Sequence, residues 1–446
     1  MVNYLPSQIG FSAIKITPLH SNIPLGGYYV RYSEGVHDDI FVRTIYLAAN
    51  EEIFIIACDL LGLYGHIINR LRKRITQRTG VKEKNILICS LHNHSAPDTI
   101  GLEGIKGYLK DTLRVDWFQK IEEKIINSAV LAKKNANYGK IGVKTKFLDM
   151  TEKLIINRRH PRQPINYPLF VFGISNETAL KASIIHYACH GTTLNRDNRL
   201  ISAEYPGYLI RKVEKNFAPH FSMYLNGPCG DINPYLFPTQ WDFNKINFDY
   251  YFKGDFGNYN ALCSYEHTQR IGERLADHAI SLLQHISTNE ITNINVYTRK
   301  IEIPIEFNAP HMKFMDKLST LLIKQGILRL LRAYNRSNVS YFSFIEKNKK
   351  MYVQTEIQLI KINNNILIVA IPAEVFHEIG EELLAQSPIK NTIIVCLAND
   401  WIGYVFPLKE CKYGGYEVFG VPNLAGILAG TIIKNTILSM YKQLSD

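Results

Sequence analysis

Histidine, carboxylate and tyrosine side chains occur in four polar clusters, each placed directly after a short apolar run that is typical of a strand. The first cluster, residues 91–98 with the sequence LHNHSAPD, contains His92 and His94. On extended backbone, residues at positions i and i+2 point to the same side. One imidazole can then bind a metal ion while the other faces a substrate. The alternative is a loop whose two rings hydrogen-bond only to backbone groups.

The second and third clusters follow later apolar runs. In residues 186–193, HYACHGTT, His186 falls inside the apolar run and is interpreted as a core histidine, whereas His190 at the strand exit is the better ligand candidate. Residues 226–234, NGPCGDINP, predict a tight loop whose backbone N–H groups converge on an anion or orient Asp231. A plain β-turn explains the composition of this third cluster equally well.

The fourth cluster ends on a carboxylate. Glu374 follows Ile371-Pro372-Ala373 at the end of an apolar run, where it can complete a zinc site. Its alternative role is an acidic N-cap of a helix over residues 375–385. Segments 399–404 and 413–416 then add Tyr404 and Tyr416, which are otherwise core or rim tyrosines. Together the clusters provide His, His and Glu from distant segments, as a discontinuous metal site requires.

Strands and helices that position these clusters alternate along the chain. Apolar runs rich in Ile and Val predict strands over residues 41–49, 52–58, 85–89, 182–186, 296–305, 351–360 and 365–371. Helical spacing predicts helices over residues 64–79, 113–136, 205–215, 265–285, 313–333, 375–385 and 424–444. The aromatic, Asn-rich segment 238–260 is expected to be a long loop that edges a pocket. Because no linker-like segment interrupts this alternation, we predict one α/β domain over residues 1–446, with mixed β-sheets flanked by helices.

Composition narrows the class of protein. The formal net charge is +11 at pH 7, but the basic residues are spread along the chain, so we expect no nucleic-acid partner. The 7 cysteines are odd in number and include no CxxC pair, which argues against a disulfide scaffold and a thiolate zinc site. Reduced thiols, an N-terminus unlike a secretion signal and the lack of a membrane-length apolar run lead us to expect a cytoplasmic protein. The oligomeric state stays open.

Taken in order, the motifs resemble those of the neutral (non-lysosomal) ceramidase family. The resemblance is carried by GFSAIKITP at residues 10–18, LGGY at 25–28, VHDD at 36–39, HNHSAP at 92–97, HGTT at 190–193, GDINP at 230–234 and PAE at 372–374. Tyr404 and Tyr416 follow in the same order, so the sparse match covers nearly the whole chain. It implies the fold of that family's catalytic domain and a zinc-dependent hydrolase that cleaves an N-acyl amide bond.

The resemblance also implies a role for individual residues. It implies zinc ligands at four positions: His92, His190, Glu374 and Tyr404. It implies three residues that face the substrate: His94 at the scissile amide, Arg158 at polar groups of the substrate and Tyr416 at the oxyanion. In addition, we expect Asp231 to position His94 or a residue that holds a metal ligand.

Two departures from the family pattern leave the substrate open. Asn233 replaces the serine of the family's GDVSPN loop, so zinc-activated water is the predicted nucleophile. We also expect a chain without the family's C-terminal immunoglobulin-like domain and without export. The substrate is then a lipid-like N-acyl amine, a soluble N-acylated amine such as an amino sugar or biosynthetic intermediate, or an ester; a non-catalytic zinc-binding homologue is a further alternative. The basic helix expected over residues 313–332 is either an ordinary surface helix or a peripheral membrane contact.

Overall fold

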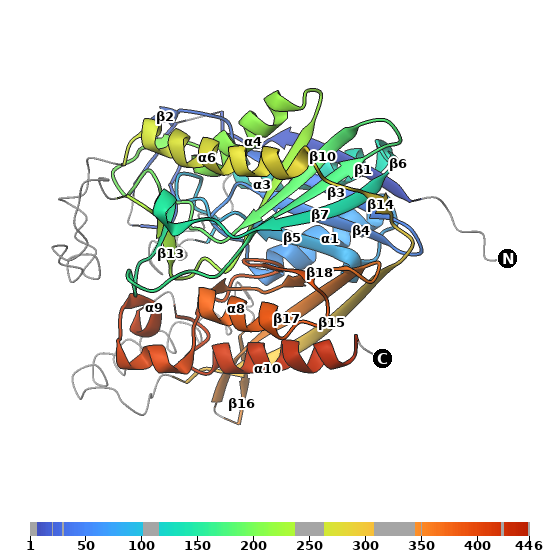
Figure 1. Ribbon diagram of the computed structural model, residues 1–446. Helices are drawn as coiled ribbons and strands as arrows, with labels where there is room; N and C mark the ends of the chain where they lie inside the picture. The colour runs from blue at the N-terminus through green and yellow to red at the C-terminus, as the bar shows by residue number, and fades with distance from the viewer. Residues whose placement is uncertain are drawn as a thin grey trace.

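Three mixed β-sheets and the helices packed on them make up the described part of the chain. The computed structural model describes residues 7–19, 21–28, 31–100, 116–236, 263–306, 344–348, 350–420 and 423–444. Figure 1 shows α4 and α6 along the top of the view, α8 and α10 along the bottom, and the sheets between them. This arrangement confirms the predicted α/β fold with mixed sheets flanked by helices. The helix expected over residues 313–333 and the loop 238–260 lie outside the described residues.

The first sheet has the strand order β5-β4-β3-β1-β6. Its strands are β5 (Ile86–Ser90), β4 (Glu52–Cys58), β3 (Phe41–Ala48), β1 (Gln8–Lys15) and β6 (Asn137–Tyr138). The pair β4–β5 is parallel and the other pairs are antiparallel. Helix α1 (Gly65–Thr79) connects β4 to β5, and α3 (Asp116–Lys134) packs on β1 and β3. Because both faces of β4 are covered, its sequence is almost continuously apolar.

The second sheet has the order β12-β10-β9-β7-β14. Its strands are β12 (Phe221–Asn226), β10 (Leu180–Tyr187), β9 (Leu169–Ser175), β7 (Lys140–Lys146) and β14 (Asn289–Glu290). Only β10–β12 is parallel among these pairs. Helix α4 (Glu204–Asn216) lies between β10 and β12 in the chain, and α4 and α6 (Tyr265–Leu283) pack together on this sheet.

The third sheet runs β15-β17-β18-β20, with β16 paired to β17. Its strands are β15 (Ile294–Pro304), β16 (Phe344–Lys347), β17 (Lys350–Ile362), β18 (Ile366–Ala370) and β20 (Asn391–Val395). Strands β17 and β18 form a hairpin across Asn363-Asn364, where Asn363 has a φ of 51°. Strands β18 and β20 are parallel, with α8 (His377–Ala385) between them in the chain, and α10 (Ala429–Lys442) packs against α8 and β15.

Each large sheet therefore contains one parallel pair joined by a helical crossover, and the carboxyl ends of the three pairs meet. Ser90 at the end of β5 donates its backbone N–H to Leu397 after β20, over 3.2 Å. Cys396 N donates to Asn226 O over 3.0 Å, and the Asn226 amide donates to Leu91 O over 3.1 Å. Ligands bind at such carboxyl ends in open α/β sheets. All four polar clusters of the sequence follow these strand ends.

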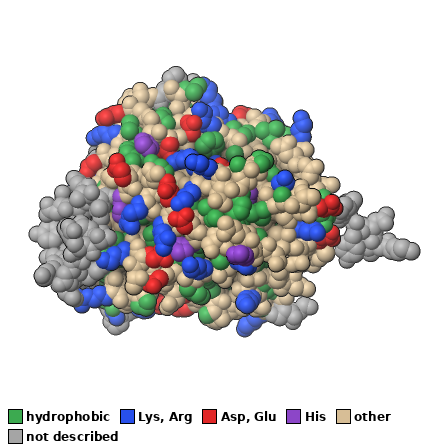
Figure 2. All heavy atoms as spheres, turned by 45° about the horizontal axis from the view of Figure 1, so that its top comes forward, with side chains coloured by type: hydrophobic (Ala, Val, Ile, Leu, Met, Phe, Trp, Pro, Cys, Tyr) green, Lys and Arg blue, Asp and Glu red, His purple; other side chains and the backbone are tan. Residues whose placement is uncertain are grey.

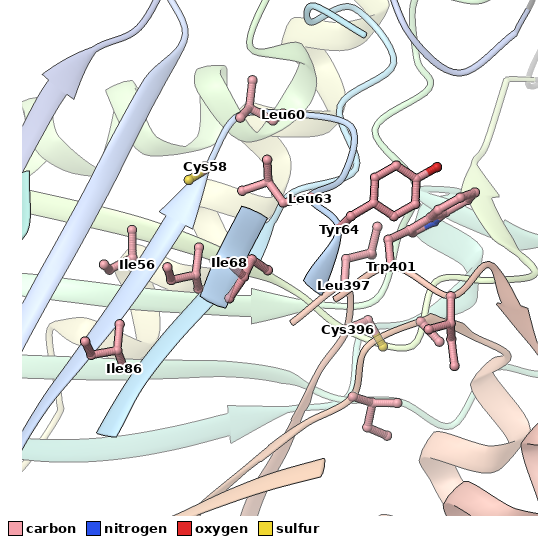
Figure 3. Packing of buried hydrophobic residues seen from close by; sticks show 14 of the residues in the cluster. Ile56, Cys58, Leu60, Leu63, Tyr64, Ile68, Ile86, Cys396, Leu397 and Trp401 are labelled. Atoms are coloured by element: carbon pink, nitrogen blue, oxygen red, sulfur yellow. The ribbon is translucent and has the colours of Figure 1, made fainter. Parts of the chain in front are cut away.

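Short elements complete the described chain. They are the pairs β2 (Gly35–Val36) with β11 (Leu200–Ile201), β8 (Ile155–Asn157) with β13 (Ile232–Pro234) and β19 (Glu374–Val375) with β21 (Tyr404–Val405), helix α9 (Tyr416–Phe419), and the 3₁₀ turns Glu83–Asn85, Met150–Glu152 and Leu408–Lys412. Figure 3 shows the apolar core beside them, where Trp401 and Tyr64 lie next to Leu63 and Leu397.

The helices predicted from residues 375 and 424 begin two or more residues later than expected. The helix predicted from residue 375 begins at His377, because Glu374 and Val375 pair with β21 as strand β19. The helix predicted from residue 424 begins at Ala429, because Gly426 has a φ of 77° and a right-handed helix cannot pass through that conformation.

Candidate functional site

His92 and His190 are buried, and both rings direct their Nε2 atom toward the same point. His92 Nδ1 lies 3.0 Å from Leu61 O, and His190 Nδ1 lies 2.5 Å from Cys229 O. A ring nitrogen facing a carbonyl oxygen must carry the hydrogen, so in both rings Nδ1 donates and Nε2 keeps its lone pair. Leu61 follows β4 and Cys229 follows β12, so a parallel pair in each of two sheets fixes the orientation of one ring. This support is typical of histidines that bind metals.

Glu374 brings a carboxylate to the same point. Its Oε2 lies 3.0 Å from His92 Nε2 and 3.2 Å from His190 Nε2. Its Oε1 accepts a hydrogen bond of 2.9 Å from Trp401 Nε1. Glu374 stands in β19, so it is not the N-cap of α8, a position that Phe376 takes. The three side chains are almost completely buried.

The donor set fits a divalent metal of the zinc type. Zinc bonds of about 2.0–2.2 Å in a tetrahedral site place neighbouring ligand atoms roughly 3.3 Å apart. The distances of 3.0 and 3.2 Å from Glu374 Oε2 to the two histidine nitrogens are close to that spacing. His92, His94 and His190 also offer ligand atoms that all lie within 4.8 Å of one another. Histidine nitrogens and a carboxylate oxygen are ligands that suit zinc as well as other transition metals.

Burial and mutual contact set the protonation of these groups. Burial alone would raise the pKa of Glu374, but His92 and His190 beside it hold this pKa well below its usual range. Burial lowers the pKa of His190 to about 4. Burial, with the neighbouring His92 and His190, also holds the pKa of His94 well below 6.5. The site therefore favours an ionised Glu374 carboxylate and neutral imidazoles at His190 and His94, the protonation states that suit metal binding.

His94 lies beside the ligand atoms but not for the predicted reason. His92 has a φ of 58°, so the two histidines do not stand on extended backbone, and that part of the prediction is wrong. The turn at His92 still brings His94 Nε2 to 3.0 Å from His92 Nε2. The His94 ring packs on Tyr28, and a Cβ added at Gly27 would lie 2.1 Å from His94 Nδ1. Glycine at position 27 is what leaves room for this ring.

Tyr404 and Tyr416 lie on the side of the site that Glu374 occupies, which we call the glutamate side. Tyr404 is directly opposite Glu374 in the β19–β21 pair, and its ring centroid lies 5.9 Å from that of Tyr416. Burial, followed by the charge of Glu374, raises the pKa of Tyr404 well above 10.0. Tyr404 is buried, whereas Tyr416 is 46% exposed. Tyr416 thus connects the buried centre with the protein surface.

Arg158 joins the tyrosines to the loop that bears Asp231. Its guanidinium carbon lies 5.5 Å from the ring centroid of Tyr404 and 5.3 Å from that of Tyr416. It donates to Glu417 Oε1 over 3.0 Å and to Asn233 Oδ1 over 3.1 Å. Asn233 is therefore a hydrogen-bond partner of Arg158.

Asp231 contacts neither His94 nor a metal-ligand candidate. Its Oδ2 lies 2.6 Å from His377 Nδ1, and its Oδ1 accepts from His377 N over 2.8 Å. The Asn157 amide also donates to Oδ2, over 3.1 Å. The expectation that Asp231 positions His94 directly is wrong, because α8 begins three residues after Glu374 and brings His377 to this carboxylate. The second alternative, that Asp231 positions a residue that holds a metal ligand, stays a prediction. Asp231 reaches the site through its loop, whose Cys229 O accepts from His190.

Sequence reasoning missed Trp401 and His377 as supports of the site. Trp401 belongs to the segment 399–404, in which only Tyr404 was predicted to be functional. His377 lies three residues after Glu374. Their partners are Glu374 and Asp231, on other segments. His186, in contrast, is the core histidine that was predicted: it is buried in β10 and lies 2.9 Å from Ile394 O.

On the face drawn in Figure 2, Lys and Arg side chains are interspersed with Asp and Glu. Among the helices that the structure describes, none has the length and apolar character that crossing a bilayer would require. The basic helix proposed for membrane contact falls within residues 307–343, outside the described ranges.

Comparisons with known sequences and solved structures find ceramidases. No protein-family model matches the chain. Neutral ceramidases of Drosophila melanogaster and Drosophila pseudoobscura pseudoobscura are each 22% identical over 326 residues, which cover 64% of this chain and 46% of each relative. The chain thus spans about half the length of the curated relatives it matches.

Solved structures extend the likeness to almost the whole chain. The neutral ceramidase from Pseudomonas aeruginosa superposes with a TM-score of 0.71 at 17% identity, covering 99% of this chain and 74% of that one. A ceramidase complexed with C2 gives a TM-score of 0.70 at 16% identity, covering 99% and 75%. The predicted resemblance is confirmed: this chain is similar in sequence to neutral ceramidases and has their fold.

Proposed function

We propose that this chain is a zinc-dependent hydrolase that cleaves the amide bond of an N-acylated amine. The observation that carries the proposal is the convergence of His92 Nε2 and His190 Nε2 on Glu374 Oε2, at 3.0 and 3.2 Å. The likeness to neutral ceramidases supports the same reaction class. When bound, zinc supplies a Lewis acid and lowers the pKa of a water ligand to about 7.

Four side chains would hold the metal: His92, His190, Glu374 and Tyr404. The two histidines are held by backbone carbonyls at Nδ1, and Glu374 is held by Trp401. Such supports fix the orientation of a ligand before the metal arrives, and they raise its basicity. Tyr404 stands in register with Glu374, which supports its assignment to the same metal.

The neighbouring groups would handle the proton and the oxyanion. His94 has its Nε2 beside the ligand atoms, so it can accept a proton from the attacking water and return it to the departing amine. Tyr416 would donate a hydrogen bond to the developing oxyanion, an interaction typically worth about 3 kcal/mol. Arg158 would orient polar groups of the substrate beside these two tyrosines.

Water is the proposed nucleophile because of Asn233. A carboxamide cannot replace a serine hydroxyl as a nucleophile. In this chain Asn233 Oδ1 accepts a hydrogen bond from Arg158, a role that needs an acceptor and no reactivity.

A lipid-like N-acyl amine is the proposed substrate class. The names of the relatives support it, and one structural neighbour is a ceramidase complexed with C2. Assays on long-chain ceramide, short-chain N-acyl amines and matched esters would separate a lipid substrate from a soluble amide or an ester.

Metal content and activity of purified protein test the proposal. We expect about one zinc per chain, and we expect His92→Ala and His190→Ala to lose both zinc and amide hydrolysis. His278→Ala is the matched control, because His278 lies on α6, where it contacts Glu152 and Lys146. Full zinc occupancy in both His variants would contradict the assigned ligands, and zinc binding without turnover on all three substrate types would contradict the activity.

A further inference from the structure

Two buried, oppositely charged side chains lie next to the histidine loops without belonging to the proposed metal centre. Arg31 and Glu204 are each 1% exposed. Arg31 comes from the N-terminal segment and Glu204 is the first residue of α4. Both charges affect the pKa of Tyr28. Burial raises this pKa well above 10.0, the charge of Glu204 raises it further, and the charge of Arg31 lowers it. Tyr28 in turn packs on His94, so both charges are close to the centre.

Glu204 joins the loop of His94 to the loop of His190. Its Oε1 accepts from Ser95 Oγ over 2.9 Å, directly after His94. Its Oε2 accepts from Thr193 N over 2.9 Å and from the Thr193 hydroxyl, and Oε1 accepts from Leu194 N over 3.2 Å. One carboxylate thus binds Ser95 and Thr193, which are about a hundred residues apart in the chain.

Arg31 holds the same two loops by donating hydrogen bonds to their backbone carbonyl oxygens. Its guanidinium donates to His94 O and, over 3.1 Å, to Gly26 O. It also donates to Asn195 O over 3.2 Å and to Asn198 O over 2.6 Å. Arg31 therefore binds the acceptors of the histidine loops, while Glu204 binds their donors.

The backbone is held in an uncommon conformation at both ends of this arrangement. Glu204 has a φ of 55° and His92 a φ of 58°, both in the left-handed region that non-glycine residues rarely occupy. Such residues persist where the surroundings hold them, and they cluster at functional sites. Further bonds lock the region: Glu204 N donates to Ser202 Oγ, and His94 N donates to Gly191 O.

We propose that Glu204 and Arg31 are positioning residues that set the affinity of the centre for its metal by holding the two histidine loops in register. The inference rests on the proposed metal centre and adds the pair as supports of its geometry. Neither residue is assigned a contact with substrate. Because the loops carry His92, His94 and His190, loss of the hydrogen bonds made by either side chain would let the imidazole nitrogens move apart.

The test compares zinc affinity across matched variants. Glu204→Gln keeps the side-chain shape but removes the charge and one acceptor oxygen, and Arg31→Lys keeps the charge but loses the planar fork. Glu214→Gln is the control: it lies on the same helix and accepts from Arg43 and from Ser222 N, at the far end from the centre. Zinc affinity is measured by chelator competition, the visible spectrum of the Co(II)-substituted protein reports ligand geometry, and thermal unfolding of the metal-free protein reports folding.

We expect both variants to bind zinc about 10–100-fold more weakly and to alter the Co(II) spectrum, while Glu214→Gln matches wild type. Wild-type affinity and an unchanged spectrum in Glu204→Gln and Arg31→Lys would overturn the inference. If Glu204→Gln does not fold, Thr193→Val, which removes one hydroxyl donor, carries the same test with about 10-fold weaker binding expected. Zinc binding needs no turnover, so wild-type protein that binds zinc but cleaves no amide would overturn the proposed function and leave this comparison intact.

Discussion

The two sides of the candidate metal centre are built by different forces. On the histidine side, loops with left-handed residues are held by carbonyls and by the buried charges of Arg31 and Glu204. On the glutamate side, Glu374 sits in a short parallel strand pair and is held by Trp401, which packs in the apolar core (Figure 3). Polar bonds are directional, so the histidine side depends on individual donors and acceptors. The glutamate side depends on strand pairing and on a single indole N–H.

The largest expected effect comes from breaking the link between the two sides. Asp231, in the loop that supports His190, binds His377, three residues after Glu374. Asp231→Asn would leave the buried His377 without its charge partner, and we expect the free energy of unfolding to fall by about 3–5 kcal/mol. Chemical denaturation at pH 6 measures this change. Stability within about 0.5 kcal/mol of wild type would mean that the two sides are not joined through this pair.

Removal of the Tyr416 hydroxyl tests where the glutamate side meets the substrate. Tyr416→Phe is expected to lower kcat by about 10²–10³-fold while zinc content stays unchanged, because an oxyanion donor acts in the transition state. Tyr413→Phe is the control, since Tyr413 is an exposed neighbour that packs on His160. A kcat equal to that of wild type would remove Tyr416 from the reaction.

Trp401 both donates a hydrogen bond to Glu374 and packs in the apolar core, so its substitution tests which of the two supports the glutamate side. Trp401→Phe removes the donor to Glu374 Oε1, and we expect zinc affinity to fall about 10-fold. Leu63→Ala, in the same core, is expected to cost about 2–5 kcal/mol of stability without changing zinc affinity. Equal zinc affinities in the two variants would show that the indole N–H does not support the ligand.

The smallest expected effect is a pH dependence of the Asp231–His377 link. Burial alone would lower the pKa of His377, but Asp231 raises it above 6.5; burial alone would raise the pKa of Asp231, but His377 lowers it below 3.8. The stabilisation from His377 is complete below its unfolded pKa of about 6.5 and is lost as pH rises through the folded value. The difference in unfolding free energy between wild type and His377→Gln should therefore shrink from pH 6 to pH 9. A difference that grows with pH would contradict the assigned ion pair.

Much of the fold could be predicted because local periodicity reports burial. The Ile-rich run at residues 365–371 becomes β18 (Ile366–Ala370), and the pattern at 64–79 becomes α1 (Gly65–Thr79), within one residue at each end. Element ends were less predictable where a tertiary contact decides them: pairing of Val375 with Val405 delays α8, and Gly426 delays α10. The domain bounds 1–446 and the compartment remain predictions, and the oligomeric state stays open.

The candidate site could be predicted in its residue types but not in its supports. His92, His190 and Glu374 follow strand ends, and strand ends can be read from the sequence. The partners of these residues cannot be read in this way, because Leu61 O, Cys229 O and Trp401 Nε1 come from other segments and two of them are backbone atoms. Asp231 illustrates the limit: its spacing gave no indication of His377, 146 residues away.

Anomalous diffraction from crystals of the zinc-loaded protein, recorded on both sides of the zinc edge, tests the central claim most directly. The account predicts one strong zinc peak per chain within bonding distance of His92 Nε2, His190 Nε2 and Glu374 Oε2. A peak at any other group of ligands, or a centre that stays empty at saturating zinc, would contradict it.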